Sequence, residues 1–213
     1  KSGSGKTTIF NLLARLYDPE NGEILMDDIN IKDLDKDTLR GNLSIISQNP
    51  YIFNMSIRDN LRLVKDGLTE KEMIHACKVA CLHDYIMSLP DGYDTIVGEG
   101  GISLSGGQRQ RLAIARALVK PADVYVFDDS FSALDFKTDA TIRKNIKENV
   151  KDATIIIVAQ RVNTIQNADK IIVLNDGKMV GFGNHEELMN SCPEYQEIVD
   201  SQTKHNRVKK EVE

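Results

Sequence analysis

The sequence predicts an α/β fold in which a mixed, largely parallel sheet is flanked by helices and interrupted by a helical insertion. The first observation is a strand–helix–strand pattern, because the apolar runs VYVF (124–127) and TIIIVA (154–159) enclose a helical stretch over 136–149. Parallel strands need such a crossover helix. The second is the opening segment KSGSGKTT (1–8), a glycine-rich loop that leads into an amphipathic helix. Together these patterns place the chain in the α/β class.

The remaining elements follow from apolar periodicity and turn residues. In chain order we expect short strands over 22–27 and 43–47, helices over 56–64 and 69–89, and a hairpin over 171–183. The longer helix opens with a capping box of Thr69 and Glu72 and closes before Pro90. The hairpin turns at Asp176–Gly177. The basic stretch KHNRVKK near the end predicts a solvated tail.

Composition narrows the class of protein. The 213 residues suit one domain or slightly more, and 41% hydrophobic with 28% charged residues is ordinary for a globular protein. A net charge of -5, without a basic run interleaved with aromatics, argues against a nucleic-acid partner. The cysteines Cys77, Cys81 and Cys192 indicate core packing in a reducing cytoplasm. There is no signal peptide, and the absence of an initiator Met indicates a fragment.

The segment KSGSGKTT, here called the phosphate loop, matches G-x-x-x-x-G-K-[ST] from its second position onward. Gly3 and Gly5 let the backbone curl until its N–H groups point at phosphate oxygens. Lys6 would reach the β- and γ-phosphates, and the Thr7 hydroxyl would bind Mg²⁺. The apolar residues of the helix that follows have amphipathic spacing: Ile9, Leu12, Leu13 and Leu16. The loop predicts a nucleotide site made of Ser2, Gly3, Ser4, Gly5, Lys6, Thr7 and Thr8.

A second helix start lies in LSGGQRQRLAIARAL (104–118), where Ser105 and Gln108 form a capping box. Two glycines leave backbone N–H groups that can approach an anion. The residues alone leave open whether this is an ordinary capped helix or a second phosphate site. Since one nucleotide does not obviously need both helix starts, we expect this one to serve a nucleotide held by another copy or a partner.

Two carboxylates follow the run VYVF. Asp128 closes the predicted strand and Asp129 comes directly after it. Gln48 follows another predicted strand. In open α/β sheets, ligands bind at the carboxyl edge of the strands. We therefore expect the Asp128 carboxylate at a ligand-binding edge of the sheet.

KSGSGKTT, Gln48 after a strand, LSGGQ, VYVFDD and SALD, in this order, closely resemble the nucleotide-binding domain of ABC transporters. LYDPENGEI, QNPYIFNMSIRDNL and LPDGYDTIVGEGG are similar in particular to the exporter type. The resemblance covers essentially the whole chain and implies a P-loop NTPase core with an α-helical subdomain carrying LSGGQ. The implied divisions are an ATPase core over 1–48 and 120–190, a helical subdomain with the signature helix over 49–119, and a C-terminal helix and tail over 191–213.

The resemblance also implies ligands and partners. ATP would be sandwiched between two such domains arranged head to tail, at the cytoplasmic face of the cell membrane, with a transmembrane domain attached. Thr7, Gln48 and Asp128 would attend Mg²⁺, while the phosphate loop holds the phosphates. The aromatic residue that stacks on adenine in this family precedes the phosphate loop.

Other matching residues would act across the dimer. Ser105, Gly107 and Gln108 would touch the γ-phosphate bound on the partner. Asp135, in SALD, would lie along the dimer seam, and Glu99 would face the transmembrane partner.

Two residues depart from the family pattern. The family places Glu at the position of Asp129, to polarise the attacking water, and His at the position of Gln160. Asp is one methylene shorter, and a ~1 Å misplacement of a catalytic group can cost about 100-fold in rate. Gln160 carries no charge and cannot shuttle a proton. We therefore expect low ATP hydrolase activity in the degenerate half of a heterodimeric multidrug exporter, in which Lys6, Asp129 and Gln160 form the catalytic set and the partner subunit is catalytically complete.

Several alternatives remain. The chain could be a fully competent ABC ATPase, or a scaffold that binds ATP without turnover. A DNA-repair or chromosome-structure ATPase would need a coiled coil or a zinc module before LSGGQ, and the sequence has neither heptads nor paired cysteines there. A tandem translation-type ATPase would carry a second phosphate loop, and none is present. Export across a membrane is the function that the sequence favours.

Overall fold

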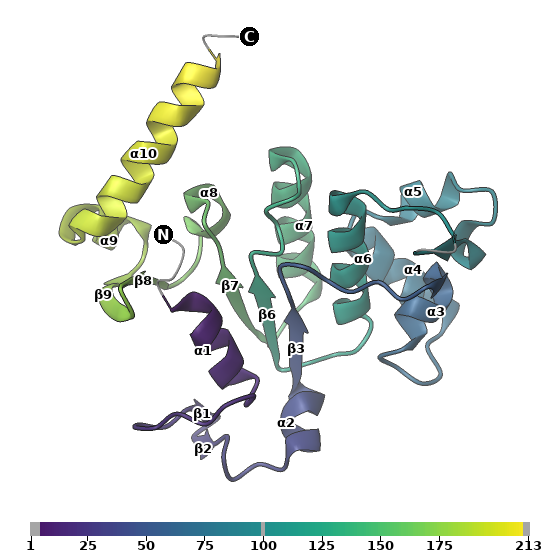
Figure 1. The fold of residues 1–213 in the computed structure, drawn as a ribbon, viewed down its shortest axis with the longest axis horizontal. Helices are drawn as coiled ribbons and strands as arrows, with labels where there is room; N and C mark the ends of the chain where they lie inside the picture. The colour runs from purple at the N-terminus through teal and green to yellow at the C-terminus, as the bar shows by residue number, and fades with distance from the viewer. Residues whose placement is uncertain (1–4, 99–100, 211–213) are drawn as a thin grey trace. The chain divides into compact units, whose positions relative to one another are not determined.

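The computed structural model describes residues 5–98 and 101–210, with side chains as far as Thr203. The chain divides into two compact units, one made of residues 1–18 and 158–213 and the other of residues 19–157. Figure 1 shows the elements of both. Because the division falls at the end of one strand, each unit is described below by itself.

The sheet of the 19–157 unit has the strand order β3-β6-β7, with β3 at Leu43–Ile46, β6 at Val124–Asp128 and β7 at Thr154–Val158. β3 and β6 are parallel, with Leu43 opposite Val124 and Ile46 opposite Phe127. Helices α6 (Gly106–Leu118) and α7 (Phe136–Asn149) contribute to the same core as these strands (Figure 1). The α/β class is therefore confirmed, as is the crossover helix over 136–149.

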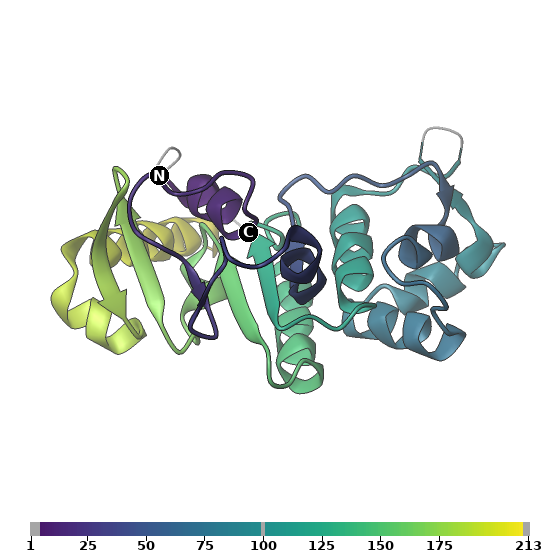
Figure 2. The same cartoon turned by 90° about the horizontal axis from the view of Figure 1, so that it is seen from below.

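Short helices make up the predicted helical insertion. They are α3 (Ile57–Arg62), α4 (Glu70–Val79), α5 (His83–Met87) and a 3-10 turn (Gly92–Asp94), with a two-residue strand pair β4 (Met55–Ser56) and β5 (Ile96–Val97). Figure 2 shows them gathered beside α6. Their fully buried side chains include Leu61, Met73, Cys77, Leu82 and Ile86. The insertion thus shares one apolar core with α6 and the sheet.

The prediction of one helix over 69–89 is wrong in one respect, because the structure has two helices there, α4 and α5. Cys81 has φ 53, in the left-handed region. Its N–H donates to the Lys78 carbonyl at 3.0 Å, and the Leu82 N–H donates to the Cys77 carbonyl at 2.8 Å. This is the pattern of a Schellman motif, which usually uses glycine. No glycine occurs at the break, so the apolar periodicity of the sequence predicts one continuous helix across it.

The strand predicted over 22–27 is also shorter than expected. β1 covers Leu25–Met26 and pairs with β2 (Ile29–Asn30) in a hairpin. Asp27 and Asp28, with φ 48 and 64, form the turn. Such a turn requires positive φ at both central positions, which Asp tolerates better than most residues. The chain then enters α2 (Lys36–Asn42), whose first turn is capped by Asp35.

The other unit contains α1 (Lys6–Leu13), the hairpin of β8 (Ile171–Asn175) and β9 (Lys178–Gly183), and helices α8 (Val162–Ile165), α9 (His185–Ser191) and α10 (Pro193–Lys210). The predicted hairpin turn is confirmed by positive φ at both Asp176 and Gly177. The apolar core of this unit comprises Val162, Ile171, Val173, Leu188, Cys192 and Tyr195.

The C-terminal stretch that was expected to be a solvated tail is helical as far as Lys210. Helix α10 therefore includes all of KHNRVKK. No Gly or Pro follows Pro193 in this stretch, so nothing in its sequence ends the helix. Within residues 5–98 and 101–210, no helix is both long and apolar enough to cross a membrane.

Candidate nucleotide-binding site

The described part of the phosphate loop is the start of helix α1. Gly5 occupies the N-cap position with φ 96, a conformation that favours glycine. As a glycine, this N-cap residue has no side chain with which to cap the helix. The first N–H groups of a helix have no partners within the helix, and such a helix start is a place where an anion can bind. Lys6, Thr7 and Thr8 form the first turn, with both threonines exposed. Ser2, Gly3 and Ser4 lie outside the described residues.

Helix α1 ends earlier than its apolar spacing suggests. Arg15 has φ 49, and its N–H donates to the Leu12 carbonyl at 3.0 Å. The Leu16 N–H donates to the Asn11 carbonyl at 2.9 Å. These bonds form a second Schellman ending without glycine. Leu16 therefore lies beyond the helix rather than on its apolar face.

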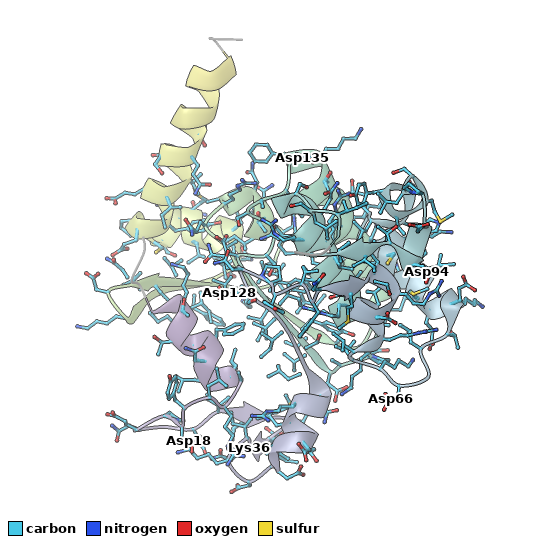
Figure 3. All side chains as sticks on the ribbon, turned by 45° about the vertical axis from the view of Figure 1, so that its right-hand side comes forward. Asp18, Lys36, Asp66, Asp94, Asp128 and Asp135 are labelled. Carbon is cyan, nitrogen blue, oxygen red and sulfur yellow. The ribbon has the colours of Figure 1, made fainter. Side chains whose placement is uncertain are left out.

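The carboxyl end of β6 places the two aspartates. Asp128 is the last strand residue (Figure 3), and Asp129 follows with φ 47. The buried Ser130 holds this turn to the neighbouring strand, since its Oγ donates to the Ile46 carbonyl at 2.8 Å. Gln48 Nε2 donates to Asp129 Oδ2 at 3.0 Å. Gln48 and Asp129 are thus brought into direct contact at the strand ends.

The start of α6 carries the predicted capping box. Ser105 Oγ accepts from the Gln108 N–H at 3.2 Å, and Gln108 Oε1 accepts from the Ser105 N–H at 2.7 Å. Both side chains use acceptor atoms in this box. The hydroxyl hydrogen of Ser105 and the Nε2 group of Gln108 are donors that the box does not use. The helix start can therefore be capped and still present donors to phosphate oxygens.

The glycines of this helix start lie against the SALD segment (residues 132–135). A Cβ atom on Gly107 would lie 3.3 Å from the Ala133 carbonyl oxygen, and one on Gly106 would lie 3.7 Å from the Ala133 Cβ. Asp135 closes the segment as the N-cap of α7 (Figure 3), where it accepts from the backbone of Lys137 and Thr138. Hydrogen bonds from Thr138 lower the pKa of Asp135. Asp135 therefore has a helix-capping role that the sequence interpretation missed.

A further residue of α6 was also missed. Gln110 is only 3% exposed. Its Nε2 donates to the Gln48 carbonyl at 3.2 Å, and its Oε1 accepts from the Ala133 N–H at 3.3 Å. Gln110 lies three and four positions before the buried Ala113 and Ile114. A polar residue at this apolar spacing was the signal that could have found it.

Gln160 follows β7 and belongs, like Lys6 and Thr7, to the unit made of residues 1–18 and 158–213. Its side chain is exposed. Gln202 of α10 fixes its backbone, donating from Nε2 to the Gln160 carbonyl at 2.6 Å and accepting from the Val162 N–H at 2.9 Å. Helix α10 thus supports the position of Gln160. Glu99 lies outside the described residues.

Comparison with known proteins identifies the family. The ABC transporter family model matches residues 1–132. The chain is 45% identical over 94% of its length to ABC transporter B family member 4 of Dictyostelium discoideum. It is 44% identical over 95% of its length to the ATP-dependent lipid A-core flippase of Haemophilus influenzae. It is 45% identical over 89% of its length to the alpha-hemolysin translocation ATP-binding protein HlyB of Escherichia coli.

A solved structure gives the same assignment. The structure of a bacterial Atm1-family ABC exporter with ATP bound matches with a TM-score of 0.91 and 40% identity, over 95% of this chain and 36% of that chain. The chain spans 26%, 35% and 27% of the three relatives' own lengths. The chain therefore belongs to the ABC transporter family, as an ATP-binding domain of the exporter type.

Proposed function

We propose that this domain powers export across a membrane, from the cytoplasmic face, together with a transmembrane domain and a second nucleotide-binding domain. The names of the relatives support export, since they describe a flippase and a translocation protein. ATP is the substrate. The proposed divisions are an ATPase core over 1–48 and 120–190 and a helical subdomain with the signature helix over 49–119. Residues 191–213 form the C-terminal part.

The residues of the chain suit Mg²⁺ as the metal that accompanies ATP. Thr7, Gln48 and Asp128 offer hydroxyl, amide and carboxylate oxygens, which are the hard ligands that Mg²⁺ prefers. Gln48 donates from Nε2 to Asp129, so its amide oxygen is the atom that can coordinate a cation. The metal would supply charge neutralisation at the phosphates. The phosphate loop, with Lys6, would hold the phosphate oxygens.

We further propose that hydrolysis at this domain's own site is impaired. The observation that carries this is the 3.0 Å hydrogen bond between Gln48 Nε2 and Asp129 Oδ2. This bond places the Asp129 carboxylate beside the Gln48 amide, and a Glu side chain at this position would extend one methylene farther. Gln160 offers a neutral amide that cannot carry a proton. Since phosphoryl transfer depends on positioning and electrostatics, such a site can hold ATP and still place the attacking water badly.

The start of α6 would then act on the nucleotide of the second domain. Ser105, Gly107 and Gln108 supply the unused donors and the backbone N–H groups described above. The impaired site requires a different, catalytically complete partner if the assembly is to turn over ATP. The proposed assembly is therefore a heterodimer.

Restoring the two departures tests the impaired site. The full heterodimeric transporter is used, with the partner's own catalytic glutamate disabled, so that only this site contributes. Asp129→Glu combined with Gln160→His should raise hydrolysis at least about tenfold, or ~1.4 kcal/mol of barrier. Asp123→Glu, an equal side-chain extension at an exposed position before β6, is the matched control and should change nothing.

Two results would favour the alternatives. If the unaltered site already turns over at a rate that the double change does not improve, Asp129 is an adequate base and the domain is fully competent. If neither form turns over while MgATP still binds, the domain is an ATP-binding scaffold.

A further inference from the structure

Gln110 is the connection between three segments that are far apart in the sequence. It lies in α6, contacts the backbone of Gln48 after β3, and contacts the backbone of Ala133 in the SALD segment. Gln110 is only 3% exposed, so its side-chain amide is largely removed from water. Buried hydrogen bonds of this kind are costly to remove, because their partners are left unsatisfied.

The chemistry of the two contacts fixes the orientation of the Gln110 amide. One contact needs a donor, because it faces the Gln48 carbonyl oxygen, and the other needs an acceptor, because it faces the Ala133 N–H. A flipped amide would place oxygen against oxygen and N–H against N–H. A neutral amide can donate to one partner and accept from the other, whereas a carboxylate or an apolar side chain of similar size cannot do both.

Each contacted segment leads directly to a proposed functional group. The Gln48 backbone carries the side chain that donates to Asp129 at 3.0 Å. The Ala133 carbonyl oxygen lies close to Gly107, since a Cβ atom added to Gly107 would be 3.3 Å from this oxygen. The Asp129 carbonyl oxygen also accepts from Ser132 Oγ at 2.8 Å, within the same turn. The Gln110 amide is therefore shared between the Gln48–Asp129 pair and the start of α6.

We propose that Gln110 is a positioning residue that holds the Gln48 segment and the SALD segment in register with α6. It acts through the backbones of Gln48 and Ala133 rather than on the nucleotide itself. It fixes Ala133 against Gly107, and so sets where the start of α6 meets the partner's nucleotide, while it also fixes the backbone of Gln48. This inference rests on the proposed function, because it concerns the same pair of sites.

Two substitutions separate the two hydrogen bonds. Gln110→Met keeps the shape and removes both. Gln110→Glu keeps an acceptor for the Ala133 N–H but loses the donor to Gln48 and places a carboxylate oxygen against the Gln48 carbonyl. Amide hydrogen exchange at Ala133, measured without nucleotide, should therefore quicken in Gln110→Met and stay slow in Gln110→Glu.

Turnover is then measured in the full transporter with the partner's site intact. Both variants should lower turnover at least about tenfold while MgATP affinity changes by less than about twofold, because the phosphate loop is untouched. Asn145→Leu is the matched control, since Asn145 Nδ2 donates to the Val79 carbonyl at 3.1 Å, a similar bond away from the strand ends. It should lower the melting temperature and leave turnover unchanged.

Two results would overturn the positioning role. In the first, Gln110→Met shows faster exchange at Ala133, but its turnover stays within about twofold of that of the unaltered protein. The other is a loss of turnover matched by Asn145→Leu at equal destabilisation. Neither result depends on Asp129→Glu with Gln160→His, so failure here is distinguishable from failure of the proposed function.

Discussion

Helices α4 and α6 begin with the same capping motif but differ in charge. In α4, Glu72 accepts from the Thr69 N–H at 3.0 Å, and the Thr69 hydroxyl caps the Glu72 N–H at 3.3 Å. In α6, the corresponding pair is Gln108 and Ser105, with distances of 2.7 and 3.2 Å. The backbone is satisfied in the same way by both boxes. The difference is that one box carries a carboxylate and the other a neutral amide.

The environments of the two boxes explain the difference. The Glu72 carboxylate also accepts from Lys65 Nζ at 2.6 Å, so its charge is used within the helical insertion. Gln108 follows two glycines and keeps an unused Nε2 donor. An anion approaching α6 would be repelled by a carboxylate at that position. Helix α4 is thus capped for stability alone, whereas α6 is capped by groups that remain compatible with a phosphate.

Exchanging the charge of the two boxes should have the largest effect on turnover. Gln108→Glu keeps an acceptor for the Ser105 N–H, so the melting temperature should change little. It removes a donor and adds a negative charge where the partner's γ-phosphate is proposed to bind. Turnover of the full transporter should fall at least about 100-fold, because one lost oxyanion donor alone costs about 10²–10³. Glu72→Gln is the converse control, and its turnover should stay within about twofold. Normal turnover in Gln108→Glu would show that α6 binds no phosphate.

The start of α1 differs from both boxes, because its N-cap residue is Gly5, which has no side chain. Its proposed phosphate contacts therefore depend on backbone N–H groups and on Lys6. Lys6→Ala should weaken MgATP binding by about 10- to 100-fold, as expected for a charge-assisted hydrogen bond worth ~1.5–3 kcal/mol. Titration of the variant measures this. Lys36→Ala, at an exposed position of α2 (Figure 3), should bind as the unaltered chain does. Equal affinities in both variants would exclude the phosphate-loop assignment.

Removing each cap separates stability from function. Ser105→Ala and Thr69→Ala should each destabilise the domain by ~1 kcal/mol, because each removes an N-cap hydroxyl. For a domain of this size that corresponds to roughly 2–4 °C in melting temperature. Ser105→Ala should also lower turnover about tenfold, whereas Thr69→Ala should not. If both variants lose turnover in proportion to stability, Ser105 is only a cap.

The sequence predicted those features whose cause is local. The capping boxes at Thr69 and Ser105 each depend on only four consecutive residues, and both are confirmed. The turn at Asp176–Gly177 is confirmed for the same reason, since Asp and Gly tolerate the positive φ that it needs.

Features that depend on distant contacts could not be predicted in this way. Arg15 and Cys81 end their helices in the left-handed region without glycine, so neither helix end could be predicted from the residue type. Gln48 and Asp129 are 81 positions apart, and only the parallel pairing of β3 with β6 brings them together. The role of Gln110 likewise needs Gln48 and Ala133 in place. These are tertiary outcomes, for which local propensity is a weak guide.

The smallest expected difference between the two boxes is their response to pH. Hydrogen bonds from Lys65 and Thr69 lower the pKa of Glu72 to about 2 from an ordinary 4.5. A folded-state pKa below the unfolded value means that the stabilisation is complete above pH ~4.5 and is lost as the pH falls toward ~2. The melting temperature should therefore fall less steeply over this range in Glu72→Gln than in the unaltered protein, because the neutral amide, like Gln108, does not titrate. Other carboxylates with lowered pKa values, such as Asp35 and Asp94, are present in both proteins and cancel in the difference. Lys65→Met removes the largest cause of the shift and should give an intermediate slope. Parallel melting curves for all three proteins would mean that the Glu72 charge contributes nothing and that the two boxes are equivalent in stability.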